Sequence, residues 1–269
     1  MLLQNLFKDL EELDPEVYER LNSRRSMFRL GAKVAAAAVP VALGSALNKA
    51  YAQTSDVAKI IDILNFALLA EYTDSTFYNL GLDAWNVIPA EDRLVWEELR
   101  NNENHHVSFV RKTIIALGGR PIERPQFDYT AKGKYPDPSR NYEVYKALAQ
   151  AFEDTGVRAY KGQAPNLIDN DAILQAALQI HSVEARHAAV VRKLRNVPPW
   201  IEFADPEGSE PLVYVGEDNK FQNDPAFIIN VAAISAPFGV GEKEATEAFD
   251  EPLSREQVTA IIAPFIVSM

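Results

Sequence analysis

The feature that most constrains the fold of this chain is a pair of Glu-x-x-His motifs, each inside a predicted helix. The chain has only four histidines, and two of them belong to the pairs Glu103–His106 and Glu184–His187. Residues three apart lie about one turn apart on the same face of a helix, so the carboxylate and imidazole of one pair can reach the same ion. Two such pairs rarely arise by chance, and a metal site of this kind needs further carboxylates from other helices.

Four long helices are predicted between Ser55 and Asn196. The first runs from a cap signal at Ser55 to Leu80 without Gly or Pro, and it is apolar on nearly all sides, which is typical of a central bundle helix. Pro and Gly mark the ends of the other three, which are predicted after Pro89 as far as Gly118, over about residues 141–163, and from Asp169 or Asp171 to just before Pro198. A long connection rich in Pro and Gly joins the second and third helices, so we expect an all-α four-helix bundle with one crossover.

The first and third helices each offer one carboxylate that would face the core. Glu71 lies in the middle of an apolar stripe, and Glu153 lies on a face of small and apolar residues. A buried carboxylate without a partner costs several kcal/mol, so a partner is expected for each. Because Glu71 and Glu103 have almost the same separation as Glu153 and Glu184, the chain looks like two repeated halves. Packed with facing cores, these halves would bring four carboxylates and two imidazoles together.

Such a set of donors is the ligand set of a di-iron or di-manganese carboxylate site in a helical bundle. Four carboxylates neutralise two divalent cations, and oxygen and imidazole donors suit iron and manganese. Residues 55–196 therefore resemble the ferritin-like superfamily, in particular its exported bacterial members. The C-terminal stretch EAFDEPLSREQVTAIIAPFI is similar to a tail of that group, which is related to desiccation-associated ferritin-like proteins of plants. The resemblance implies six metal ligands: Glu71, Glu103, His106, Glu153, Glu184 and His187. Of these, it implies Glu103 and Glu184 as the bridges between the two ions.

Other polar residues near these six have plainer interpretations. His181 is expected to be a structural histidine, with a donor that supports a metal ligand or a residue of a substrate channel as the alternatives. His105 is expected to be a surface or interhelical residue, because it points about 100° away from His106. Asp74 and Asp154 are either buried acids beside the ligands or charges on the helix surface. Three tyrosines are expected to pack in the core, with electron transfer or a hydrogen bond to a metal-bound ligand as the alternatives: Tyr72, Tyr78 and Tyr160.

The N-terminal residues carry the pattern of an export signal. Arg24-Arg25 precedes an alanine-rich stretch that ends in an A-x-A pattern at residues 50–52, which is typical of a cleaved twin-arginine signal. Lys33 and Pro40 interrupt the apolar run, which makes it a poor transmembrane helix. We expect residues 1–52 to engage the twin-arginine export machinery and the mature protein to be periplasmic or otherwise extracytoplasmic. The alternative is a basic turn before a buried alanine-rich helix, and the acidic segment before the arginines is unusual for a signal.

Residues 197–269 differ in character from the bundle at 53–196. They are rich in proline and contain two strand-like pieces, EPLVYVG and AFIINVAAI. A final helix is signalled by a capping box that begins at Ser254. We interpret this segment as an irregular and helical extension that packs on the bundle, and not as an independent catalytic domain.

Composition limits the chemistry and the partners. The chain has no cysteine, which excludes thiolate zinc sites, iron–sulfur clusters and a rubredoxin-type iron centre. Electrons would therefore come from Fe(II) itself or from an external donor. A net charge of −11 argues against broad nucleic-acid binding.

The favoured hypothesis is a protein with two iron ions that oxidises Fe(II), reduces O₂ or H₂O₂, or does both. One alternative is a manganese catalase-like enzyme with two manganese ions, which would dismute H₂O₂ without a donor. Another is a stress or desiccation protein in which the metal site is structural. A storage cage of many subunits is disfavoured by the long proline-rich tail, although the sequence allows assembly into a homo-oligomer.

Overall fold

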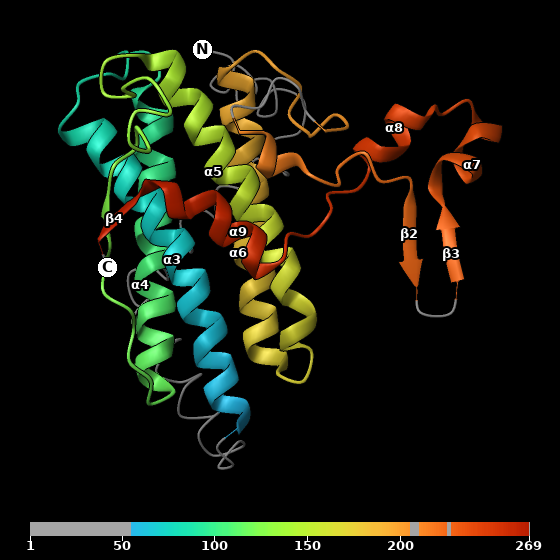
Figure 1. Cartoon of the computed structure of the whole chain (residues 1–269), viewed down its shortest axis with the longest axis horizontal. Helices are drawn as coiled ribbons and strands as arrows, with labels where there is room; N and C mark the ends of the chain where they lie inside the picture. Colours follow the sequence, from blue (N-terminus) through green and yellow to red (C-terminus); the bar gives the residue numbers. More distant parts are fainter. Residues whose placement is uncertain (1–54, 205–209, 225–226, 269) are drawn as a thin grey trace, which may run out of the picture.

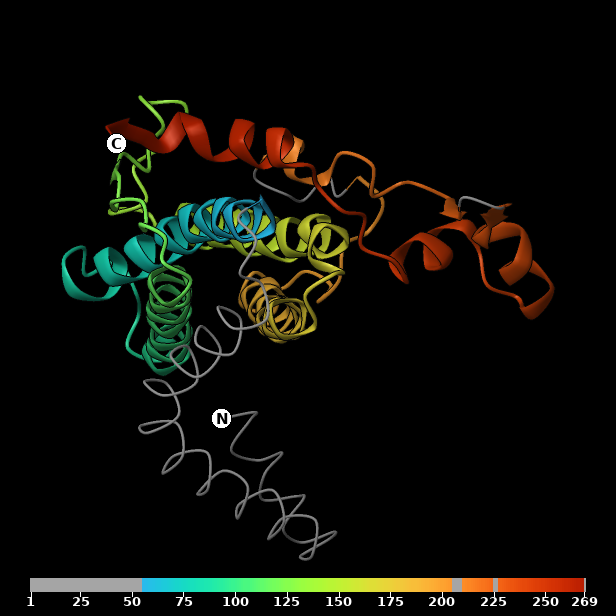
Figure 2. The same cartoon turned by 90° about the horizontal axis from the view of Figure 1, so that it is seen from below.

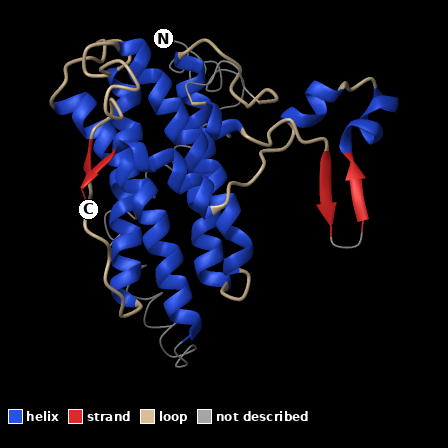
Figure 3. Ribbon diagram, in the orientation of Figure 1, coloured by secondary structure: helices blue, strands red, loops and turns tan. Residues whose placement is uncertain are grey.

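The computed structural model describes residues 55–204, 210–224 and 227–268. The predicted export signal, residues 1–52, lies outside the described residues. Four long helices form a bundle (Figures 1 and 3): α3 (Ser55–Asp83), α4 (Arg93–Ala116), α5 (Tyr142–Gln163) and α6 (Asp171–Leu194). The predicted all-α bundle with a long connection between its second and third helices is thereby confirmed. Within the described ranges, no helix has the length and apolar character needed to cross a membrane.

Local chemistry explains where α5 and α6 begin. The side chain of Asn141 caps α5 by accepting hydrogen bonds from the backbone N–H groups of the first turn. Asn170 caps α6 in the same way, whereas the sequence had suggested Asp169 or Asp171. Helix α3 continues through Gly81, where a Cβ atom would lie 2.4–2.6 Å from the ring of Tyr145. This glycine is therefore a packing residue and does not end the helix.

The helices pack in pairs, α3 with α4 and α5 with α6, and the pairs meet mainly through α3 and α5. Two apolar clusters fill the bundle. One contains Leu68, Val110 and Ile173, and the other contains Phe77 and Trp96. Along each helix the polar residues of the predicted metal site lie between the residues of these two clusters. Burial of the apolar side chains on both sides therefore places the polar residues at the middle of the bundle.

The C-terminal extension packs across the bundle and also projects from it. Helix α9 (Arg255–Ile262) lies over α3 and α5, on the side away from α4 and α6 (Figure 2). Strand β4 (Ile266–Ser268) then pairs with β1 (Gln126–Phe127) of the long connection. A hairpin and two short helices project away from the bundle (Figure 1): β2 (Phe221–Asp224), β3 (Phe227–Asn230), α7 (Val231–Ser235) and α8 (Glu242–Glu247).

Two details of the predicted extension differ from the structure. EPLVYVG is not a strand, because residues Pro211–Tyr214 form the 3₁₀ helix η2, with proline at its start and the Glu210 side chain as its cap. AFIINVAAI is half strand and half helix, since Asn230 caps α7 immediately after β3. The predicted capping box at the start of α9 is confirmed, with Ser254 and Gln257 bonded reciprocally.

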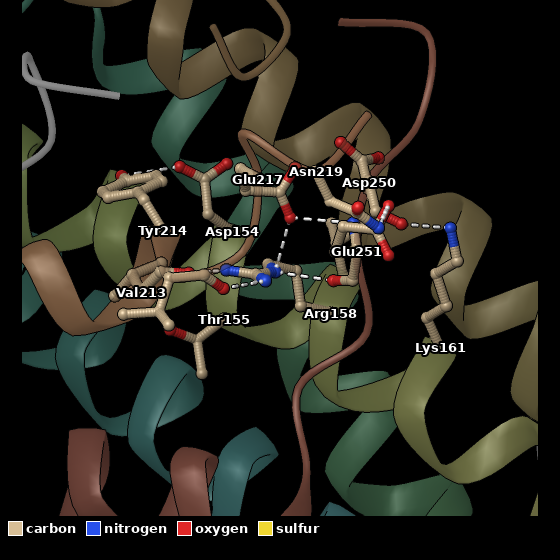
Figure 4. Close-up of polar contacts among 12 residues, drawn as sticks. Asp154, Thr155, Arg158, Lys161, Val213, Tyr214, Glu217, Asn219, Asp250 and Glu251 are labelled. Carbon is tan, nitrogen blue, oxygen red and sulfur yellow. Dashed lines mark hydrogen bonds and ion pairs between the residues drawn. The ribbon is translucent and has the colours of Figure 1, made fainter. Parts of the chain in front are cut away.

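Arg158 of α5 anchors this extension (Figure 4). Its guanidinium group is fully buried and donates hydrogen bonds to the carbonyls of Val215 and Glu251, at 2.7 and 2.6 Å, and also to the carbonyl of Val213. The carboxylate of Glu217 forms an ion pair with it at 2.7 Å. A buried guanidinium with this many acceptors fixes two distant parts of the extension against one helix.

Candidate metal centre

The structure brings all six predicted ligands together in the middle of the bundle. Helices α3 and α5 contribute one glutamate each, and α4 and α6 contribute the two Glu-x-x-His pairs. All six are buried, with exposed fractions of 8% for His106 and 0–4% for the others. Their donor atoms form two overlapping groups, each with all its atoms within 4.8 Å of one another. Glu103 and Glu184 belong to both groups, Glu71 and His106 complete the first, and Glu153 and His187 complete the second.

The donor atoms of the six residues converge without pairing as hydrogen bonds. His106 Nδ1 lies 2.9 Å from a carboxylate oxygen of Glu184, and His187 Nδ1 lies 2.7 Å from one of Glu103. These contacts lack hydrogen-bond geometry, and each of the six residues has at least one buried oxygen or nitrogen without a hydrogen-bond partner. Buried polar atoms are nearly always satisfied, so this convergence indicates a place for cations. The residues present therefore fit bound metal ions.

The cluster is strongly coupled electrostatically. Burial raises the pKa of Glu71 to about 7 and the pKa of Glu184 well above its usual range. Burial opposes the charged form of His187 as well, but the carboxylates of Glu153 and Glu103 raise the pKa of this imidazole to about 11. Without metal the cluster thus holds protons, which divalent cations would displace on binding.

The comparison with protein families agrees with this geometry. A family described as the ferritin-like domain matches residues 59–197, more than half of the chain and nearly all of the four-helix bundle. The chain belongs to the ferritin-like domain family. A comparison with curated protein sequences gives no match.

Two tyrosines of the ferritin-like bundle hold the outer glutamates. Tyr160 of α5 donates a hydrogen bond to Glu71 Oε1 of α3, and Tyr78 of α3 donates one to Glu153 Oε1 of α5. In each glutamate the other oxygen, Oε2, is the one without a partner. Besides packing in the core, these two tyrosines therefore have the alternative role considered from the sequence. Tyr72 does not, because its hydroxyl donates to the backbone carbonyl of Ile122 at 3.3 Å.

The two bonds are reciprocal, and a repeated spacing in the sequence produces them. Tyr78 follows Glu71 by seven residues, and Tyr160 follows Glu153 by seven. Seven residues make about two helical turns, so each tyrosine lies on the same face as the glutamate of its own helix. The hydroxyl group of each tyrosine, however, donates its hydrogen bond to the glutamate of the facing helix. This Glu-x₆-Tyr repeat was the signal in the sequence that could have found the tyrosine bonds.

The two aspartates left open by the sequence are both buried, but they differ in their surroundings. Asp74 lies one turn after Glu71, and its Oδ1 has no hydrogen-bond partner. Burial and the nearby carboxylates, Glu153 first, raise the pKa of Asp74 well above its usual range. Asp154 instead pairs with Arg192 at 2.7 and 3.1 Å and accepts a hydrogen bond from Tyr214 of the extension at 2.8 Å.

The remaining histidines lie as expected. His181 is half-buried, and its Nδ1 lies 3.0 Å from the carbonyl of Val157, which fits a structural role. His105 is exposed. A residue that sequence reasoning missed is Gly156, where a Cβ atom would lie 2.9 Å from Glu184 Oε2. It leaves room for a carboxylate shared by both donor groups.

Proposed function

We propose that this ferritin-like protein binds two iron ions through the six residues and uses them to oxidise Fe(II) while reducing O₂ or H₂O₂. The observation that carries the proposal is the pair of overlapping donor groups that share Glu103 and Glu184. Two shared carboxylates would hold two cations side by side, and four carboxylates would balance the charge of two divalent ions. The N-terminal sequence pattern supports a periplasmic location.

Each residue has a definite task in this proposal. Glu103 and Glu184 would bridge the two ions, while Glu71 with His106 and Glu153 with His187 would complete the two ends. When bound, the iron pair would supply electrons to O₂ or H₂O₂. Tyr160 and Tyr78 fix one oxygen of each outer glutamate and leave the other oxygen turned to the cluster.

The surroundings of the cluster support redox chemistry in a dry site. Along the helices, the apolar clusters above and below the site, which include Leu68 and Phe77, keep bulk water away from the carboxylates. Asp74 would hold a proton at its carboxyl group beside the cluster, because its charged form is strongly disfavoured there. Such a proton is available where reduction of O₂ or H₂O₂ consumes protons.

A manganese catalase-like activity is the second candidate. The same donors suit two manganese ions. The observation that favours it is the absence of cysteine from the whole sequence, which leaves no built-in thiolate centre for electron transfer. Dismutation of H₂O₂ needs no external electrons and would be compatible with such a chain.

Elemental analysis of the protein purified from the periplasm tests the proposal first. We expect about two irons per chain, and loss of metal in Glu103→Ala but not in the control Glu98→Ala, an exposed glutamate of the same helix. The second assay follows H₂O₂ consumption with and without added Fe(II). Two manganese ions with O₂ release and no donor would favour the catalase reading. A chain that binds neither metal would refute both.

A further inference from the structure

A pocket of about 260 Å³ lies between α4 and α6, next to the metal cluster. Helix α4 packs mainly on α3, and α6 packs mainly on α5, so the described parts of α4 and α6 are not closely packed against each other. Both helices lie on the side of the bundle away from α9 (Figure 2). The pocket therefore opens on a face that α9 leaves uncovered.

His106 connects this pocket to the cluster. It is the only one of the six predicted ligands that lines the pocket. It also has the largest exposed fraction of the six, 8% against 4% or less. Its Nδ1 lies 2.9–3.4 Å from three carboxylates of the cluster, so this edge of the ring faces the metal site. Of the six residues, His106 is thus the one through which a molecule in the pocket would contact the centre.

The residues that line the pocket are polar at its mouth and mostly apolar further in. His105 and Gln179 are exposed and lie at the mouth, Phe109 and Val183 are half-buried, and Ile180 is buried with His106 at the inner end. None of the lining residues is Asp, Glu, Lys or Arg. The net charge of −11 attracts cations to the chain as a whole, but the walls of this pocket supply no carboxylate to bind one there. An ion would also lose its hydration against apolar walls without a compensating partner.

The pocket is much larger than a molecule of O₂ or H₂O₂. An apolar cavity of about 150 Å³ is enough to bind benzene. The pocket beside His106 is larger, at about 260 Å³, and leaves room for a substituent on such a ring. An oxidant as small as O₂ or H₂O₂ would pass through the pocket without filling it.

We propose that this pocket is a binding site for a neutral one-ring organic molecule that carries one polar group. The ring contacts Phe109, Val183 and Ile180 beside His106, and the polar group hydrogen-bonds at the mouth, where Gln179 and Ser108 offer donors and acceptors. The proposal goes beyond the proposed function, because binding depends on the pocket and not on which metal is present or what it does.

The test uses benzamide and two charged relatives of similar size, benzoate and benzylammonium. Each is titrated by calorimetry into the full chain, both with metal and after treatment with a chelator. Benzamide is expected to bind with a dissociation constant of about 1 mM in both forms, as for a ligand of this size. The two charged molecules are expected to bind at least about tenfold more weakly, because their charged groups would lose hydration in the pocket without gaining a partner.

Two tryptophan variants on α6 locate the binding. Ala176→Trp fills the pocket from its wall and should weaken benzamide binding by at least about tenfold. Leu178→Trp, at an exposed position that does not line the pocket, should leave it unchanged. Metal content should be the same in both variants, because residue 176 is two turns from Glu184. If Ala176→Trp fails to fold, Ser108→Phe fills the same space from α4.

Three results would overturn the proposal. The first is that benzamide does not bind to the full chain. The second is that it binds unchanged to the variants that fill the pocket, and the third is that a charged relative binds as tightly as benzamide. Because benzamide binding is measured on metal-free protein too, its outcome is separate from that of the iron proposal. A chain that takes up no metal but still binds benzamide in this pocket would contradict the proposed function alone.

Discussion

Replacing Tyr160 by phenylalanine removes one hydroxyl group and, with it, the hydrogen bond that fixes Glu71 at one end of the metal cluster. The ring remains, so packing in the core changes little. A hydrogen bond to a charged group contributes about 1.5–3 kcal/mol. If that free energy goes into orienting the ligand, metal affinity at the Glu71 end should fall by about 10- to 100-fold, the usual effect of losing a bond that orients a metal ligand.

The hydrogen bond from Tyr78 to Glu153 gives a second variant, in which we expect the other end of the metal cluster to be weakened. Tyr78→Phe should weaken the end that contains Glu153 and spare the end that contains Glu71, since Tyr78 donates only to Glu153 among the predicted ligands. Tyr72→Phe is the matched control, because Tyr72 is also buried and hydrogen-bonded but contacts none of the six residues through its hydroxyl group.

The assay is an anaerobic titration of metal-free protein with Fe(II) against a coloured chelator, which resolves two binding constants. The expected pattern is one weakened site in each tyrosine variant and two unchanged sites in the control. Wild-type affinities at both sites in Tyr160→Phe and Tyr78→Phe would refute the positioning role. Equal weakening in Tyr72→Phe would show a general loss of stability instead.

Three further predictions follow from the same geometry. Glu103→Ala should lose both metal ions and Glu153→Ala only one, because Glu103 alone of the two belongs to both donor groups; elemental analysis of the variants checks this. In Asp74→Asn the metal-free protein should gain about 1–3 kcal/mol of stability at pH 8, with the gain shrinking towards pH 4, as followed by thermal melts in a chelator. The raised pKa of Asp74 means that its protonated form stabilises the fold at low pH, and this contribution is lost as pH rises through the folded-state pKa. Arg158→Met should lower the free energy of unfolding in urea by about 3–5 kcal/mol, since Glu217 would remain buried without its partner, whereas the exposed Arg186→Met should have little effect.

The two halves of the site are similar but not equivalent. The Glu-x₆-Tyr spacing is repeated, yet the position three residues after the glutamate is Asp74 in the first half and Gly156 in the second. The aspartate adds a buried acid, and the glycine makes room for Glu184. Only His106 of the two predicted histidine ligands lines the pocket. We therefore expect the two metal positions to differ in affinity and in access.

The sequence by itself determined the positions of the four helices and the six residues at their centre. Both are local properties, because the apolar period and the Glu-x-x-His spacing can be read along one helix at a time. Repetition of the pattern in two halves then required the four carboxylates to meet. The short apolar run EPLVYVG shows the limit of such reading, since its length fits a strand or a helical turn equally and a cap at Glu210 selects the turn.

Only the tertiary structure decided which residues meet across helices. The spacing places Tyr160 on the face of Glu153, but its bond to Glu71 exists because α3 and α5 lie opposite each other. Likewise Asp74 and Asp154 look alike in sequence, and only packing gives the second a guanidinium partner in Arg192. The pocket beside His106 depends on the gap between α4 and α6. Local periodicity fixes the direction of a side chain on its own helix, whereas long-range packing determines what it faces.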